Sequence, residues 1–319
     1  ASFNEANESA PQINWDEITL EAPDKTGISV WNKIPLDQIV PYIDWSPFFW
    51  TWGMKGTYPK ITESPKYGEE AKKLFKDANK ILNDIVKNNR FSPKAVWGLW
   101  PANSEGNDIR LFKDENREET VEVLHFLRQQ KEKKEDGQSY QSLADFVAPK
   151  GYQDYCGAFV VTMGEEVEKY AQEIQDKGDD YTSILIKAIG DRLAEALAEM
   201  LHKKVRDNWK FGLKEELTQE DLIKEKYRGV RPAPGYPACP DHSEKEIIWR
   251  LLDAQKNTGA TLTENFAMSP ASSVSGLYMQ YPNSKYFNLG TIGEDQLEDY
   301  AKRKGKTLEE MKRWLAPNL

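Results

Sequence analysis

The sequence has few of the residues that organise disulfide-rich, metal-binding or membrane proteins. It contains two cysteines and three histidines in 319 residues. Two cysteines are too few for a disulfide framework and fit a reducing compartment, so we expect a cytoplasmic protein. No apolar run approaches the roughly 18–20 residues that span a membrane, and no signal-peptide pattern is present. We therefore predict no membrane partner.

An excess of positive charge is also missing. The formal net charge is −9 and the isoelectric point is near 5.2, whereas a nucleic-acid-binding domain usually carries a basic surface. We therefore predict no nucleic-acid partner. The chain also lacks a Gly-x-Gly-x-x-Gly pattern after a strand, a phosphate loop, a Gly-x-Ser-x-Gly elbow and a His-Glu-x-x-His pair. A nucleotide-like ligand would accordingly be held without a Rossmann crossover.

The apolar content is sufficient for a large core, with 39% hydrophobic residues and ten tryptophans. Residues 1–30 are polar and acidic, and we predict that they form a linker from a preceding module. The first residue is Ala rather than Met, which suggests a cut from a longer protein. Helical and strand-like segments do not alternate regularly. For residues 31–319 we therefore predict one large α+β domain with a mainly antiparallel, bent sheet flanked by helices, not Rossmann-like.

Hydrophobic periodicity and turn signals predict the individual elements. Helices are expected at 67–89, 180–206, 294–303 and 307–314, and strands at 95–100, 108–112, 157–163, 260–267, 272–280 and 285–289. Residues 119–128 fit either type, and the charged tract 128–137 is expected to be a surface loop. Ser243 and Glu246 have the spacing of a capping box for a helix that ends near Gly259.

The most distinctive stretch is Arg-Pro-Ala-Pro-Gly-Tyr-Pro-Ala-Cys-Pro, residues 231–240. Its four prolines exclude a helix and a central strand, and they push the preceding residues toward extended geometry. We predict a stiff ribbon lining a groove, in which Gly235 lets a ligand approach the backbone. Arg231 offers a planar fork for a carboxylate or phosphate. The alternative is an ordered connection that only ties down the next helix.

Arg231 and residues 235–240 resemble the S-adenosylmethionine-binding signature of the activation domain at the C-terminal end of cobalamin-dependent methionine synthase. In-order flanking segments agree with the same family: residues 42–49, 74–79, 143–149 and 313–319. The resemblance implies binding of S-adenosylmethionine and reductive methylation of cob(II)alamin to methylcobalamin, which reactivates this methyltransferase of methionine biosynthesis. It also implies two partners: the cobalamin-binding module, which holds most of the cobalamin, and a flavodoxin-like or flavin reductase. The domain alone is not expected to make methionine.

The resemblance further implies a set of ligand-binding residues: Asp44, Glu195, Arg231, Ala233, Gly235, Tyr236, Tyr286 and Phe287. In this interpretation Arg231 pairs with the ligand carboxylate, and Asp44 and Glu195 hold the ammonium. Backbone groups of residues 233–236 read the adenine. Tyr236 is the candidate catalytic residue that faces the cobalamin. The cofactor itself carries the difficult chemistry, and the domain binds and orients the methyl donor.

Some of these residues have simpler interpretations. An aspartate such as Asp44, next to Trp45 and close to Pro47, commonly caps a turn or helix. Tyr286 has the character of a half-buried core aromatic. Glu195, Glu199 and His202 share one face of a helix. Glu199-x-x-His202 is the ligand pair of di-metal bundles, but no second copy exists, so we expect a partly solvated face with one Glu turned toward a pocket.

Zinc binding is disfavoured, and two other function classes remain as alternatives. A zinc site at Cys239-x-x-His242 lacks further ligands, because structural zinc requires four. A protein-interaction module could use the aromatic stretch 42–58 and the ribbon without any small molecule. A metalloenzyme using Glu195, Glu199 and His202 would carry bound metal.

Overall fold

The centre of the fold is a six-stranded antiparallel sheet in the order β4-β3-β2-β5-β8, with β1 pairing beside β2. The computed structural model describes all residues, 1–319. The strands of this sheet are β1 (Gly27–Trp31), β2 (Lys94–Glu105), β3 (Asp108–Phe112), β4 (Thr120–His125), β5 (Asp154–Thr162) and β8 (Ser273–Tyr278). Two short strands, β6 (Thr261–Leu262) and β7 (Met268–Ser269), pair separately.

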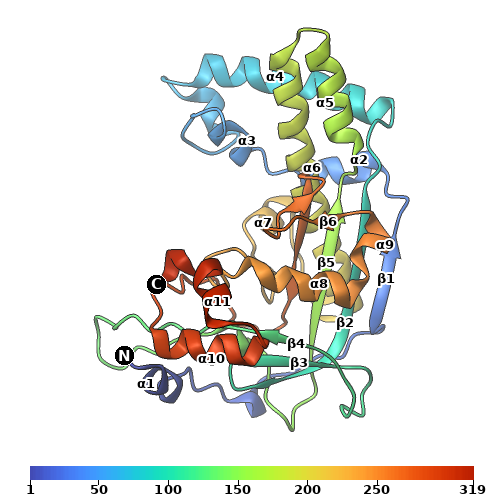
Figure 1. Cartoon of the computed structure of the whole chain (residues 1–319). Coiled ribbons are helices and arrows are strands. Elements are labelled where there is room, and N and C mark those ends of the chain that lie inside the picture. Colours follow the sequence, from blue (N-terminus) through green and yellow to red (C-terminus); the bar gives the residue numbers. More distant parts are fainter.

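The sheet bends because the long strand β2 changes partner halfway along. Residues 95–99 of β2 pair with β1, whereas residues 102–105 pair with β3. β3 and β4 consequently run at a steep angle to β1 (Figure 1). The predicted α+β class and the mainly antiparallel, bent sheet are confirmed.

Eleven α-helices surround the sheet. They are α1 (Phe3–Glu8), α2 (Leu36–Ile39), α3 (Ser46–Trp50), α4 (Gly68–Lys87), α5 (Glu166–Asp176), α6 (Asp180–Asn208), α7 (Gln219–Ile223), α8 (Lys245–Leu252), α9 (Ala254–Thr258), α10 (Glu294–Lys304) and α11 (Leu308–Trp314). None of them combines the length and the apolar character required to cross a membrane.

Two hydrophobic cores lie on opposite faces of the sheet, because strand side chains alternate between the faces. Phe159 of β5 packs in the core formed with α4, α5 and α6, and its neighbour Val160 packs in the core formed with α8 and α9. Every residue of β5 is buried as a result. A third, smaller core joins α10 and α11 to the loop before α10.

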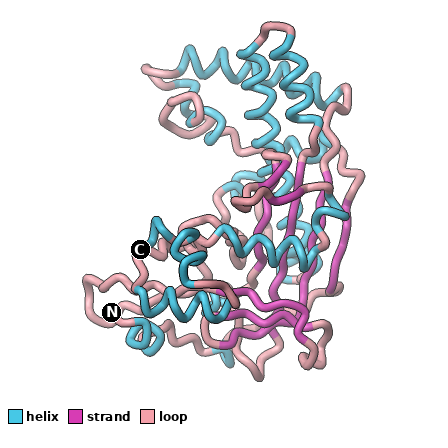
Figure 2. Tube along the Cα trace, viewed as in Figure 1, coloured by secondary structure: helices cyan, strands magenta, loops and turns pink.

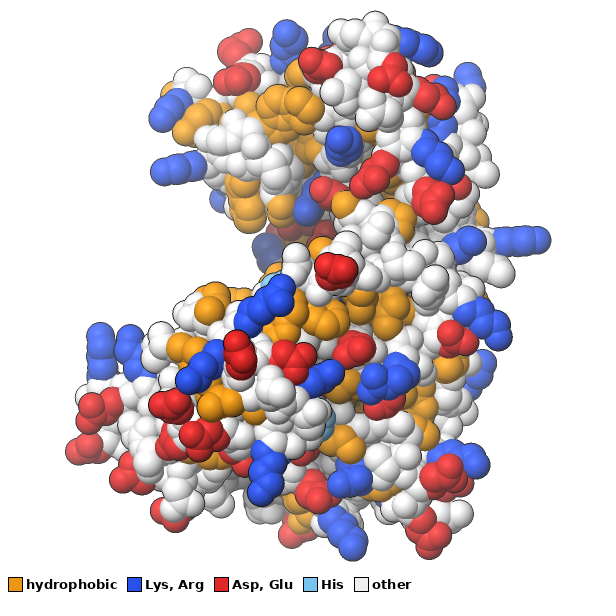
Figure 3. Space-filling view, viewed as in Figure 1, with side chains coloured by type: hydrophobic (Ala, Val, Ile, Leu, Met, Phe, Trp, Pro, Cys, Tyr) orange, Lys and Arg blue, Asp and Glu red, His pale blue; other side chains and the backbone are white.

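The helices are distributed unevenly, which gives the molecule a hollowed outline. α3, α4, α5 and the first half of α6 form a helical end, while α10 and α11 lie at the other end (Figures 1 and 2). Between them the surface is deeply hollowed, and hydrophobic side chains lie on both walls of the hollow (Figure 3). α6, with 29 residues, joins the helical end to the sheet.

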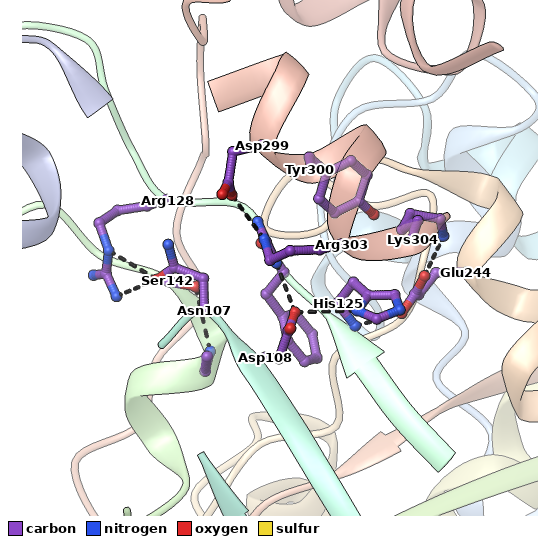
Figure 4. A network of polar contacts seen from close by, with 12 residues as sticks. Asn107, Asp108, His125, Arg128, Ser142, Glu244, Asp299, Tyr300, Arg303 and Lys304 are labelled. Atoms are coloured by element: carbon purple, nitrogen blue, oxygen red, sulfur yellow. Dashed lines mark hydrogen bonds and ion pairs between the residues drawn. The ribbon is translucent and has the colours of Figure 1, made fainter. Parts of the chain in front are cut away.

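A network of buried charges fastens α10 to the sheet (Figure 4). Arg303 donates to Asp108 Oδ1 at 2.6 Å, and the same carboxylate oxygen lies 3.1 Å from His125 Nδ1. The next residue, Lys304, pairs with Glu244 and with Asp241 at 3.0 Å. Asp241 and Glu244 lie directly after the proline-rich ribbon, so the network also fixes the end of the ribbon.

The predicted helices 67–89, 180–206, 294–303 and 307–314 are confirmed as α4, α6, α10 and α11. The strand predicted at 285–289 is wrong, because these residues form a loop without ladder bonds. The capping box is also wrong: Asp241 accepts from the Ser243 N–H, and the following helix is interrupted at Asp253, whose φ is 47°. Arg128, expected in a surface loop, is 3% exposed and pairs with Asp145 at 2.7 Å.

Residues 1–30 pack along the sheet and contribute a strand to it. The Phe3 N–H donates to Asp295 at 2.7 Å, and Trp15 is buried in the α8-side core. β1 crosses the expected boundary at residue 31 and pairs with β2. These residues are therefore a structural part of the domain, while their role as a connection to a preceding module stays a prediction.

Candidate functional site

The proline-rich ribbon begins as an additional edge beside β8. The Val230 N–H donates to the Met279 carbonyl at 3.1 Å, and the Met279 N–H donates to the Val230 carbonyl at 3.2 Å. The Leu277 N–H donates to the Pro232 carbonyl at 2.8 Å. Gly276 permits this approach, since a Cβ there would lie 2.8 Å from the Pro232 oxygen. The predicted extended geometry therefore applies to the first part of the ribbon.

Beyond Ala233 the ribbon turns away from β8. The Gly235 N–H donates to the Cys239 carbonyl at 2.8 Å, and the Cys239 thiol donates to the Ala233 carbonyl at 3.0 Å. Gly235 has φ 94°, and a Cβ there would lie 2.3 Å from His242 Cε1. The side of Gly235 on which a Cβ would lie therefore faces His242, which accounts for the glycine, while the approach of a ligand to its backbone stays a prediction.

The departure of the ribbon opens a cleft against α6 and β8. One cavity of about 530 Å³ and an adjoining one of about 330 Å³ share Glu195, Glu225, Arg231 and Tyr236 in their walls. The larger cavity extends to Phe159, Val274, Ser275, Ala238, Cys239 and Phe287, and the smaller one extends to Tyr42, Asp44 and Arg192. We refer to both together as the cleft.

Arg231 lies in the wall between the two cavities, and its guanidinium is held by α6. Nη1 donates to the Ala198 carbonyl and Nη2 donates to Glu199 Oε2, both at 3.1 Å. Burial is the largest influence on the pKa of Arg231 and lowers it, but the carboxylate of Glu199 and the neighbouring tyrosines together outweigh burial, so the pKa lies above its ordinary value. Arg231 is thus a permanent cation at the cleft, with the N–H groups not used by α6 available to a ligand.

Besides Glu199, three carboxylates line the cleft near this cation. Glu195 lies one helical turn before Glu199 on α6, and Asp44 reaches the smaller cavity from the loop before α3. Asp44 Oδ1 also accepts from the Ser46 N–H at 3.1 Å, so the turn interpretation and the cleft interpretation both hold. Glu225, in the loop after α7, accepts from the Tyr227 hydroxyl at 3.3 Å. Glu225 was missed, because nothing in its local sequence distinguishes it from neighbouring charges.

Two tyrosines line the cleft with much of their surface open. Tyr286 is 46% exposed and accepts a bond from the Arg231 N–H at 3.1 Å, so it is not a core residue. Partial burial, followed by the charge of Glu225, raises the pKa of Tyr286 to about 12. Tyr236 is 61% exposed, and its pKa is raised by partial burial and then by Glu195. Phe287 packs edge-on against Phe146 and closes the apolar end.

We predicted that Glu195, Glu199 and His202 share a partly solvated face of α6. The prediction of solvent exposure is wrong for Glu199 and His202. Glu199 and His202 are 7% and 2% exposed. His202 stacks on Tyr278 with ring centroids 5.0 Å apart, and burial lowers its pKa well below the ordinary value. The structure contains no group of three or more His, Cys, Asp and Glu side chains placed to hold a metal ion. Glu199 instead serves as the counter-ion of Arg231.

The cleft has two cations, Arg192 and Arg231, and four carboxylates at one end and apolar, aromatic surface at the other. This combination suits a zwitterionic ligand that carries an additional positive charge and a flat ring. Seven of the eight predicted binding residues line the cleft, and only Gly235 does not. The fold and the cleft define an α+β small-molecule-binding domain.

Comparison with known proteins identifies the family. The profile described as "Vitamin B12 dependent methionine synthase, activation domain" matches residues 35–305. The chain is also 47% identical to the protein in "Crystal Structure of the MetH Reactivation Domain bound to AdoHcy", with a TM-score of 0.96, covering 100% of this chain and 98% of that one. The chain therefore belongs to the activation-domain family of vitamin B12-dependent methionine synthase, a methyltransferase.

Proposed function

We propose that this domain binds S-adenosylmethionine in the cleft and supports reductive methylation of cobalamin held by another module of the same enzyme. The observation that carries the proposal is the meeting of Arg231 with Asp44, Glu195 and Glu225 around one cleft that ends in apolar surface. The similar MetH reactivation domain was solved bound to AdoHcy, the demethylated form of the same ligand.

Each part of the ligand has a chemically suitable partner. The free N–H groups of Arg231 pair with the carboxylate, and Asp44 and Glu195 hold the ammonium. Glu225 faces both cavities and stabilises the sulfonium by its charge. The adenosyl group occupies the apolar end beside Tyr286 and the ribbon.

The methyl transfer to cob(II)alamin requires one electron from outside the domain. The C–S bond of the sulfonium breaks, its electron pair stays on sulfur, and S-adenosylhomocysteine leaves as a neutral thioether. The methyl group forms its new bond with cobalamin, which starts in the cob(II) state and receives one electron from a flavodoxin-like or flavin reductase. Cobalamin supplies the nucleophilic metal when it is bound nearby. The residues of this domain bind and orient the methyl donor, and no general base is required.

Tyr236 is our candidate for the side chain that faces the cobalamin, because it lies in both cavities and remains largely exposed. Tyr236→Phe should reduce reductive methylation while leaving S-adenosylmethionine affinity unchanged. An unchanged methylation rate would remove any role for the hydroxyl.

The proposed partners follow from this reaction. The cobalamin-binding module has to approach the cleft during reactivation and withdraw afterwards, and the reductase has to deliver its electron while the module is near. We also propose a cytoplasmic location, because both cysteines are free and buried, as expected in a reducing compartment.

Calorimetric titration of S-adenosylmethionine into the purified domain tests the proposal. We expect saturable binding at one site. Arg110→Ala is the control, since Arg110 lies on β3, away from the cleft, and pairs with Glu105 at the end of β2. No binding by a folded protein would overturn the proposal and favour a protein-interaction module. Reductive methylation is then measured in an enzyme that contains both this domain and the cobalamin-binding module.

A further inference from the structure

The edge of β8 beside the cleft has backbone groups that the ribbon does not use. Leu277 of β8 and Met279, just after it, direct their backbone groups toward the ribbon. There they form hydrogen bonds with Pro232 and Val230. Hydrogen-bonding direction alternates along an antiparallel strand, so Ser275 directs its N–H and C=O toward the same edge. Ser272, three residues before Ser275, directs its carbonyl to the opposite side, where it accepts from the N–H of Met163, the residue after β5. This agrees with the alternation.

The residue that would pair with Ser275 is Pro234, if the ribbon continued in the same register. Pro234 has no N–H to donate. The chain also turns at Gly235, where the N–H bonds to Cys239 instead. The ladder therefore ends one pair before Ser275, and the cavity begins there, with Ser275 in its wall.

The side chain of Ser275 is unpaired as well. The residue is 3% exposed, and its hydroxyl has no hydrogen-bond partner in the protein. Leaving a buried hydroxyl unpaired is unfavourable, and rotation about χ1 moves it between staggered positions. Ser275 thus contributes three unused polar groups in one place: an N–H, a C=O and a hydroxyl.

Beside these groups the cavity is apolar, lined by Phe159, Val274, Ala238, Cys239 and Phe287. The charged residues at the other end account for the amino-acid part of an S-adenosyl ligand. An adenine ring presents an amino donor next to a ring-nitrogen acceptor on one edge, which matches a backbone C=O next to an N–H.

We propose that Ser275 is the residue that reads the adenine edge, with its C=O accepting from the amino group and its N–H and hydroxyl available to the ring nitrogens. This inference rests on the proposed function. It assigns base specificity to β8, in addition to the ribbon. The selectivity follows from donor and acceptor order, because a hypoxanthine ring would place an oxygen against the Ser275 carbonyl.

The test compares S-adenosylhomocysteine with S-inosylhomocysteine by calorimetry in the wild-type domain, in Ser275→Ala and in Ser29→Ala. Ser29 lies on β1, outside the cleft, and is the matched control. The wild type should prefer the adenosyl ligand by on the order of 100-fold, because an analogue with the wrong polar group leaves buried groups unpaired. Ser275→Ala should bind S-adenosylhomocysteine about 3- to 10-fold more weakly, and Ser29→Ala should bind it normally.

The outcomes separate this inference from the function it rests on. Tight binding of both ligands by the wild type would overturn the reading of the adenine edge by Ser275. Identical affinities for Ser275→Ala and Ser29→Ala would overturn the role of its hydroxyl. Both outcomes leave the proposed function intact. Failure of the folded wild-type domain to bind S-adenosylhomocysteine would overturn both.

Discussion

The salt bridge between Arg231 and Glu199 allows ligand binding and stability to be separated experimentally. Replacing Arg231 by Ala removes two bonds of 3.1 Å, to Ala198 and Glu199, and leaves a buried carboxylate unpaired. Breaking a buried pair in this way costs about 3–5 kcal/mol of unfolding free energy. Glu199→Gln removes the negative charge but leaves an amide oxygen that accepts from Arg231, so the loss should be about 1–3 kcal/mol.

The two substitutions should affect ligand affinity in opposite ways. Arg231→Ala removes the partner of the ligand carboxylate, which should weaken S-adenosylmethionine binding by about 2–5 kcal/mol, or roughly 30-fold to several thousand-fold. Glu199→Gln keeps the guanidinium and removes a carboxylate that competes for it. Its affinity should therefore equal or exceed that of the wild type.

Urea unfolding measures the stability of each variant, and calorimetric titration under strongly native conditions measures its affinity. Circular dichroism confirms that the variants remain folded. If both variants lose affinity to the same extent, Arg231 acts only by holding the ribbon against α6. Normal affinity in a folded Arg231→Ala protein would refute the carboxylate interaction itself.

Three other predictions follow from the geometry. Glu225→Gln should weaken S-adenosylmethionine binding about 2- to 5-fold without affecting S-adenosylhomocysteine, because only the former carries the sulfonium charge; equal losses in paired titrations would contradict this. Because burial lowers the native pKa of His202 well below 6.5, protons bind the unfolded chain first, and unfolding free energy should fall below pH 6.5 by up to about 1.4 kcal/mol per pH unit. His202→Phe keeps the stack on Tyr278 and should lose this component in urea titrations at pH 7.5 and 5; an unchanged slope would assign it to other groups. Lys304→Met should destabilise the protein by about 3–5 kcal/mol by leaving Asp241 and Glu244 unpaired, and a loss below 1 kcal/mol would show that the network is not stabilising.

Long periodic segments were predictable because their signal is local. The apolar spacing in residues 180–206 is sufficient to locate α6, and the four prolines after residue 231 are sufficient to exclude a helix. The resemblance located most of the cleft, because its motif covers the ribbon and its flanks cover the loop before α3.

The features that were missed depend on partners distant in the sequence. Arg128 lies in a charged tract, but it is buried because Asp145 and Asn107 satisfy its guanidinium. Gly235 is required by its close contact with His242, seven residues later. Glu225 and Ser275 become visible as cleft residues only once the ribbon is placed beside β8, which no local pattern specifies.

The pairing of the ribbon with β8 also protects the protein from unwanted assembly. β8 lies at the end of the sheet order, and an open strand edge is a template for pairing with other chains. Val230 and Pro232 cover part of this edge, and on the outer side of the ribbon the Arg231 N–H already donates to the Tyr286 hydroxyl at 3.1 Å. At Ser275 the turned ribbon leaves the cavity in place of a continuous strand edge. The edge can therefore remain chemically open to a ligand while being closed to aggregation.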